Sequence, residues 1–88
     1  MNEQGRVDAV VRGVLRDVLG ISQKRVDEFS ADTELFGALP ELDSMAVAGL
    51  LTELEDRLDI TIDDDDVDGE ILASFGALVD FAAAKVSA

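Results

Sequence analysis

The sequence predicts an all-α bundle of three long helices and one short helix, with a long loop between the first two long helices. Three stretches of the 88-residue chain repeat apolar residues at spacings of three and four, the pattern of a helix with one buried face. Glycine, serine, aspartate and proline interrupt this pattern between the first two stretches. Because the chain contains no cysteine, aliphatic packing must stabilise it, and we expect residues 1–88 to form a single domain.

The first long helix is predicted to run from about Glu3 to Leu19. Gly20 follows it, and glycine is typical just after a helix because that position often needs a positive φ. The face expected to be buried consists of Val7, Val10, Val11, Val14, Leu15, Val18 and Leu19.

Residues 20–43 keep no helical period and are predicted to form a long, partly ordered loop. We expect Leu35 and Phe36 to anchor this loop to the core, and Leu42 to anchor its end. A loop of this length in a small domain usually has a functional reason.

The second long helix is predicted to begin at Asp43-Ser44 and to end near Leu58-Asp59, with Asp43 as its N-cap. Its expected buried face is Val47, Leu50, Leu51, Leu54 and Leu58. Residues 60–62 are predicted to be an extended connection, and the acidic residues 63–70 a linker with one short helical turn. The last helix is predicted from about Ser74 to Lys85, and its apolar face is Leu72, Phe75, Leu78, Val79, Ala82 and Val86.

The charge of the chain restricts its function. Twenty acidic residues against seven basic ones give a net charge of −13. Such a chain is expected to repel nucleic acid and anionic membranes and to attract basic protein surfaces. Without histidine or cysteine it lacks the usual general base and thiol nucleophile, so we expect no enzyme. The N-terminal residues resemble no signal peptide, and a cytoplasmic monomer is expected.

Ser44 is the residue with the clearest chemical potential. It lies off the buried stripe of the second helix, so its hydroxyl is expected to point into solvent at a helix N-terminus. Free N–H groups and the positive end of the helix dipole favour a phosphate ester there. The simpler interpretation is that Asp-Ser only caps the helix.

The segment Leu42-Asp43-Ser44-Met45 resembles the Asp-Ser-Leu/Met signature of acyl carrier proteins, and the similarity extends over nearly the whole chain. The resemblance implies that Ser44 carries 4′-phosphopantetheine, transferred from coenzyme A by a phosphopantetheinyl transferase, and that acyl groups are held on this arm as thioesters. It also implies loading and transfer enzymes with basic docking surfaces as partners. The recognition surface it implies comprises Asp43, Met45, Ala48, Thr52, Glu53, Glu55 and Asp56.

Two residues depart from the pattern of carriers that serve fatty acid synthesis. Ala46 and Gly49 stand where many of those carriers have acids. Residues 37–47 instead resemble carriers found with exosortase and exopolysaccharide systems, which implies a specialised pathway rather than bulk fatty acid or polyketide synthesis. An aminoacyl or peptidyl carrier, and an unmodified acidic interaction module, remain alternatives.

The acidic run also resembles the start of a calcium-binding loop. Asp64, Asp66, Asp68 and Gly69 fit positions 1, 3, 5 and 6 of an EF-hand, but Phe75 occupies position 12, where a bidentate glutamate is needed. We therefore expect no metal site. Divalent cations are still expected to stabilise the chain by relieving repulsion among these acids.

Overall fold

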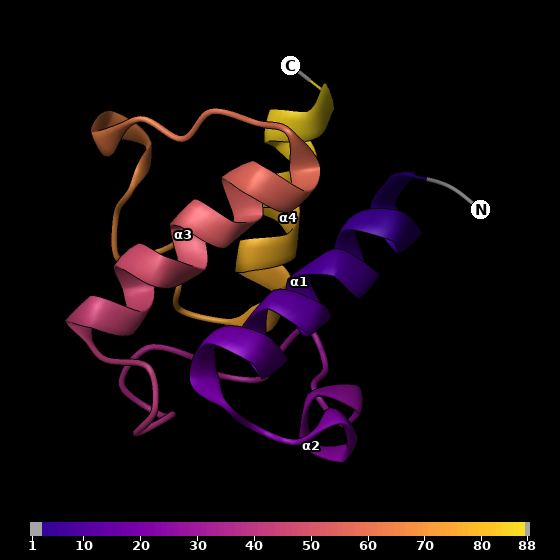
Figure 1. The fold of residues 1–88 in the computed structure, drawn as a ribbon, viewed down its shortest axis with the longest axis vertical. Coiled ribbons are helices and arrows are strands. Elements are labelled where there is room, and N and C mark those ends of the chain that lie inside the picture. The colour runs from indigo at the N-terminus through magenta and orange to yellow at the C-terminus, as the bar shows by residue number, and fades with distance from the viewer. Residues whose placement is uncertain (1–2, 88) are drawn as a thin grey trace.

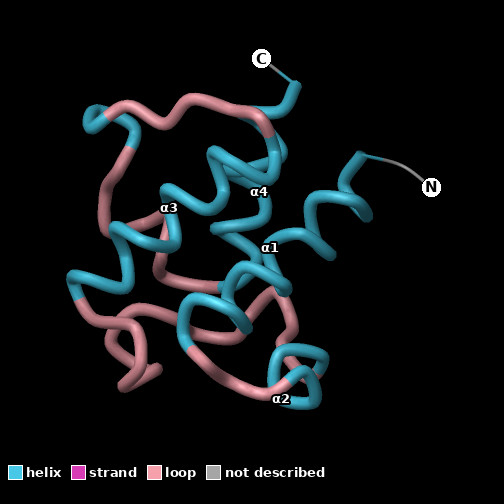
Figure 2. The backbone as a smooth tube through the Cα atoms, viewed as in Figure 1, coloured by secondary structure: helices cyan, strands magenta, loops and turns pink. Residues whose placement is uncertain are grey.

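Four α-helices and one 3₁₀ turn make up the computed structural model, which describes residues 3–87 (Figure 1). Within these residues Figure 2 shows helices joined by loops and no strand. The elements are α1 (Glu3–Leu19), α2 (Gln23–Asp27), α3 (Ser44–Leu58), η1 (Asp64–Asp66) and α4 (Phe75–Ser87). The predicted all-α bundle and its three long helices are confirmed.

Helix α1 is the central element, because it packs against each of the other three α-helices. Its buried residues are Val7, Val11, Val14 and Leu15, which lie on the predicted face. Gly20 ends the helix with a φ of 68°, and its amide donates to the Arg16 carbonyl at 2.9 Å. A residue with a β-carbon would be strained at this φ, so the glycine stops the helix as the sequence predicts.

The core joins the three long helices to the loop that follows α1. Helix α3 contributes Leu50, Leu54 and Leu58, and α4 contributes Phe75, Leu78, Val79 and Ala82. Each such side chain stabilises the fold by about 1.5–3 kcal/mol relative to exposure. The loop side adds buried Ile21, Val26, Phe29, Leu35, Leu39 and Leu42.

Helix α2 was not predicted, since residues 20–43 were expected to be loop throughout. Ser22 caps it by accepting a hydrogen bond from the Arg25 amide at 3.1 Å, and Val26 is its one buried residue. Five residues are too few to show an apolar period, which is why the sequence pattern misses the helix. The short turn expected within residues 63–70 is present as η1.

The loop pairs with the start of α4 through backbone hydrogen bonds. The amides of Leu35 and Phe36 donate to the carbonyls of Ala73 and Leu72 at 3.3 and 3.0 Å. In the opposite direction, the Phe75 amide donates to the Thr33 carbonyl at 2.8 Å. The residues around positions 31–36 are therefore fixed against α4 although nothing in their sequence looks helical or strand-like.

This pairing explains why one predicted loop anchor is wrong. Leu35 is fully buried, as expected, but Phe36 is 53% exposed. Consecutive residues of an extended segment point to opposite sides, so only one of the pair can face the core. Phe36 faces the surface near the start of α3, where it becomes part of the site described next.

Candidate functional site

Ser44 is the first residue of α3, and its side chain is exposed. Asp43 precedes it in an extended conformation and caps the helix, because its carboxylate accepts a hydrogen bond from the Ala46 amide at 2.8 Å. The Asp43 carbonyl accepts from the Val47 amide at 2.9 Å. The cap therefore fixes the backbone on both sides of the serine and confirms the predicted start of the helix.

The environment of Ser44 suits a phosphate group. Among residues 3–87, the amides of Ser44 and Met45 have no hydrogen-bond acceptor, since the carboxylate of Asp43 takes the Ala46 amide instead. Free amides at the positive end of a 15-residue helix favour an anion. An exposed hydroxyl at this place can therefore carry a phosphodiester without the loss of an existing contact.

An apolar cavity of about 250 Å³ opens beside the serine. Its lining brings together three separate parts of the chain: the first loop, the start of α3 and the segment before α4. The lining residues are Phe36, Ser44, Val47, Gly69 and Leu72. No local sequence pattern predicts this cavity, because its walls meet only in the folded chain.

Two large apolar side chains are exposed next to the serine. Met45 is 85% exposed and Phe36 is 53% exposed. In a chain with a net charge of −13, exposed apolar side chains near one hydroxyl mark the surface around Ser44 as a place where another molecule can bind.

Four of the predicted recognition residues form one exposed strip along α3. At about 100° per residue, Met45, Ala48, Thr52 and Asp56 fall on the same side of the helix, and all four are exposed. The Thr52 hydroxyl donates to the Ala48 carbonyl at 2.9 Å. The strip carries only one charge, at its Asp56 end.

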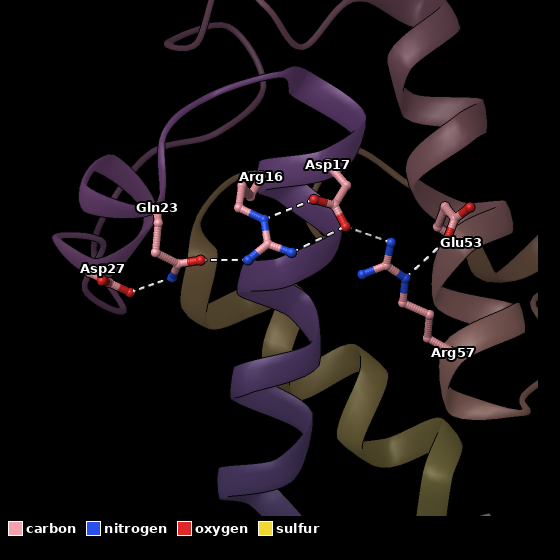
Figure 3. A network of polar contacts seen from close by, with 6 residues as sticks. All are labelled: Arg16, Asp17, Gln23, Asp27, Glu53 and Arg57. Atoms are coloured by element: carbon pink, nitrogen blue, oxygen red, sulfur yellow. Dashed lines mark hydrogen bonds and ion pairs between the residues drawn. The ribbon is translucent and has the colours of Figure 1, made fainter.

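Of the other three predicted recognition residues, Asp43 caps the helix, and Glu53 and Glu55 are engaged within the molecule. Glu53 accepts a hydrogen bond from Arg57 at 3.0 Å, and Arg57 also contacts Asp17 of α1 at 2.7 Å (Figure 3). Glu55 accepts a hydrogen bond from the Ile62 amide at 2.8 Å. Both glutamates thus hold elements of the fold in place, and their role in the recognition surface stays a prediction.

The network in Figure 3 ties α1 to α3 and to α2. Hydrogen bonds from Arg16 and Arg57 lower the pKa of Asp17 to about 2. Arg16 also donates to Gln23, which in turn donates to Asp27.

Hydrogen bonds organise the acidic run before α4. The Asp63 amide donates to the Asp66 carboxylate at 2.9 Å, and the Asp68 carboxylate accepts from the Glu70 and Ile71 amides. Within residues 3–87, no group of three or more acidic side chains is arranged to hold a metal ion. Lys85 instead contacts Asp66 at 2.5 Å.

These features, an exposed serine at the start of a helix beside an apolar cavity on a small helical bundle, are typical of a carrier protein. A family model described as a phosphopantetheine attachment site matches residues 9–82. The chain belongs to the acyl carrier protein family, whose members bear covalently bound 4′-phosphopantetheine and are carriers rather than enzymes. The exposed serine, free amides and neighbouring cavity fit this group.

A solved structure supports this assignment. The chain is similar to a holo acyl carrier protein from Nitrosomonas europaea, determined by NMR in solution, with a TM-score of 0.83 and 38% sequence identity. The match covers 93% of this chain and 96% of that protein. No curated protein sequence gives a significant match. None of the helices in the described residues is long and apolar enough to cross a membrane.

Proposed function

We propose that Ser44 is the attachment residue and that the chain carries apolar acyl intermediates between the enzymes of a specialised pathway. The observation that carries this proposal is the exposed Ser44 hydroxyl at the capped start of α3, beside an apolar cavity. No other serine in the described residues combines the first position of a helix with such a cavity. All four α-helices contribute to one core, which supports a single carrier domain.

The residues around Ser44 have distinct tasks in the proposed modification. The Ser44 hydroxyl oxygen loses its proton and forms the phosphodiester, while the nucleotide half of coenzyme A leaves. Asp43 holds the backbone of the first helical turn, and the free amides of Ser44 and Met45 face the new anion. When bound, the arm supplies a thiol that holds the acyl group as a thioester, which a chain without cysteine cannot supply itself.

The surface of α3 supports partners other than those of bulk fatty acid synthesis. Ala46 and Gly49 replace acids, and the exposed strip from Met45 to Thr52 carries no charge. Partners are therefore proposed to contact the strip mainly through apolar atoms, with basic groups directed at Asp56 and the acidic residues around it. An apolar cavity favours an apolar acyl group over an aminoacyl group, because a charged amine gains nothing from burial there.

Intact-mass spectrometry tests the attachment. Apo protein incubated with coenzyme A, Mg²⁺ and a broad-specificity phosphopantetheinyl transferase is expected to gain the mass of one phosphopantetheine. Ser44→Ala is expected to gain none, and Ser22→Ala, which changes an exposed serine on another helix, is expected to gain the full increment. An increment that persists in Ser44→Ala, or an unchanged wild type, would refute the assignment.

A further inference from the structure

The segment that precedes α4 is strongly self-repulsive. Residues 63–70, called the acidic segment below, contain six carboxylates and no basic residue: Asp63, Asp64, Asp65, Asp66, Asp68 and Glu70. After Arg57, the only basic residue in the sequence is Lys85. Like charges at this density favour an expanded chain, so a folded path for the segment needs a compensating contact.

Lys85 supplies that contact from the last turns of α4. Its ammonium lies 2.5 Å from a carboxylate oxygen of Asp66, and this pairing lowers the pKa of Asp66. The same Asp66 oxygen accepts the hydrogen bond from the Asp63 amide at 2.9 Å. Asp66 therefore both stabilises the η1 turn, through the Asp63 amide, and links the turn to α4, through Lys85.

Three anchors hold the acidic segment along its length. Before it, the Ile62 amide donates to Glu55 of α3. After it, the Leu72 carbonyl accepts from the Phe36 amide. Between these two ends, the contact of Asp66 with Lys85 is the one link to another helix that the described residues show. Figure 1 shows this stretch, in orange, between the end of α3 and the start of α4.

The same segment forms one wall of the cavity beside Ser44. Gly69 lies between the Lys85 contact and the Leu72 anchor, and it lines the cavity opposite residues of α3 and the first loop. Gly69 is exposed, and a β-carbon added to it would meet no atom within 4 Å. Gly69 itself therefore has no packing that holds it in place. Its position depends on the Asp68 hydrogen bonds around it, on the packing of Ile71 against the core and on the anchors on either side.

We propose that Lys85 is a positioning residue of the carrier site. Through Asp66 it holds the acidic segment where Gly69 closes the apolar cavity, so that an apolar acyl group on the arm is kept from water. Without the ion pair the segment moves outward, and the cavity opens. The effect on the acyl group rests on the proposed attachment at Ser44. The contact of Lys85 with Asp66 can be tested on protein that carries no arm.

Hydrogen exchange on the unmodified protein tests the contact. Lys85→Gln is expected to raise the exchange rates of the amides at residues 66–71 about two- to fivefold, the range for loss of a partly exposed ion pair. Lys85→Arg is expected to restore slow exchange. Arg16→Gln, which removes one cation and one ion pair on α1, is the matched control and is expected to leave these amides unchanged. Equal exchange in wild type and Lys85→Gln would overturn the inference.

The lifetime of the thioester tests the role in the site. Protein loaded with an eight-carbon acyl group is expected to hydrolyse two- to fivefold faster in Lys85→Gln than in the wild type, Lys85→Arg or Arg16→Gln. A loaded aminoacyl group is expected to show no such difference, because it gains nothing from the cavity. Faster amide hydrogen exchange in Lys85→Gln with an unchanged lifetime of the eight-carbon thioester would overturn the positioning role. Failure of the Ser44 assignment would appear earlier, as absent loading in the mass spectrum.

Discussion

Gly76 is a residue at which the backbones of the first loop and α4 lie close together. Its amide donates to the Ala31 carbonyl at 3.0 Å. A β-carbon at position 76 would lie 2.9 Å from both the β-carbon and the carbonyl oxygen of Ala31. Because the crowded atoms belong to the backbone and to a short side chain, they cannot rotate away.

Gly76→Ala is therefore expected to lower the free energy of unfolding by about 1–3 kcal/mol, measured by urea denaturation. The sign of this change in the free energy of unfolding is informative, because replacing glycine by alanine inside a helix ordinarily stabilises the helix by about 0.5–1 kcal/mol. Gly69→Ala, where there is open space, is the control and is expected to stay within about 0.5 kcal/mol of the wild type. A stabilised Gly76→Ala protein would show that the two segments are not in close contact.

At the scale of the elements, α3 depends on its cap. Asp43 satisfies the Ala46 amide and adds negative charge at the positive end of the helix. At the other end, Asp59 adopts a left-handed conformation with a φ of 54°, and its amide donates to the Glu55 carbonyl. The two residues fix the length of the helix that presents Ser44.

Substitutions of Asp43 can separate its structural role from recognition by the transferase. Asp43→Ala is expected to lower the free energy of unfolding by about 1 kcal/mol, because an amide loses its acceptor. Asp43→Ser keeps a capping oxygen and is expected to remain near wild-type stability in thermal denaturation. If Asp43→Ser folds normally but is loaded more slowly, the carboxylate also serves recognition. If both variants are equally unstable, the carboxylate has a structural role beyond capping.

The elements also show what the sequence could predict and what it could not. The long helices were predicted because their apolar residues repeat over three or more turns, and Asp43 and Gly20 mark ends of two of them. Helix α2 is shorter than two turns and shows no period. Ser44 is predicted from a local signature, whereas Phe36 and Gly69 line the cavity beside it only through backbone pairing and chain folding that no local pattern encodes.

At the scale of the whole molecule, charged side chains connect helices that are far apart in the sequence. Arg57 of α3 contacts Asp17 of α1, and Arg12 of α1 lies 4.4 Å from the centre of the Phe75 ring of α4 and contacts Asp8 and the Val26 carbonyl. Arg12 and Arg57 thus join helices of this acidic chain.

The Asp17 contacts predict a pH dependence of stability. The pKa of Asp17 is about 2 in the folded chain and 3.8 without its partners, so the folded state favours the ionised form. The contribution of the Asp17 contacts to the free energy of unfolding is complete above pH 3.8 and is lost as the pH falls through about 2. The stability difference between wild type and Asp17→Asn, from urea denaturation, is therefore expected to be largest near neutral pH and to shrink over this window.

Asp56→Asn, which removes one exposed carboxylate on α3, controls for the change in net charge. A difference between wild type and Asp17→Asn that is the same at pH 2 and pH 6 would contradict the assigned cause.

The backbone pairing between the first loop and α4 has a consequence for how the chain opens. Two of the first amides of α4, those of Phe75 and Gly76, are satisfied by carbonyls of Thr33 and Ala31, more than 40 positions earlier in the chain. The first turn of the helix loses its acceptors when the loop detaches, and the loop carbonyls lose these donors when the helix frays. The two segments therefore belong to one cooperative unfolding unit. A protease site or a fusion partner inserted at residues 31–36 would thus disrupt the C-terminal helix, although that position is a loop.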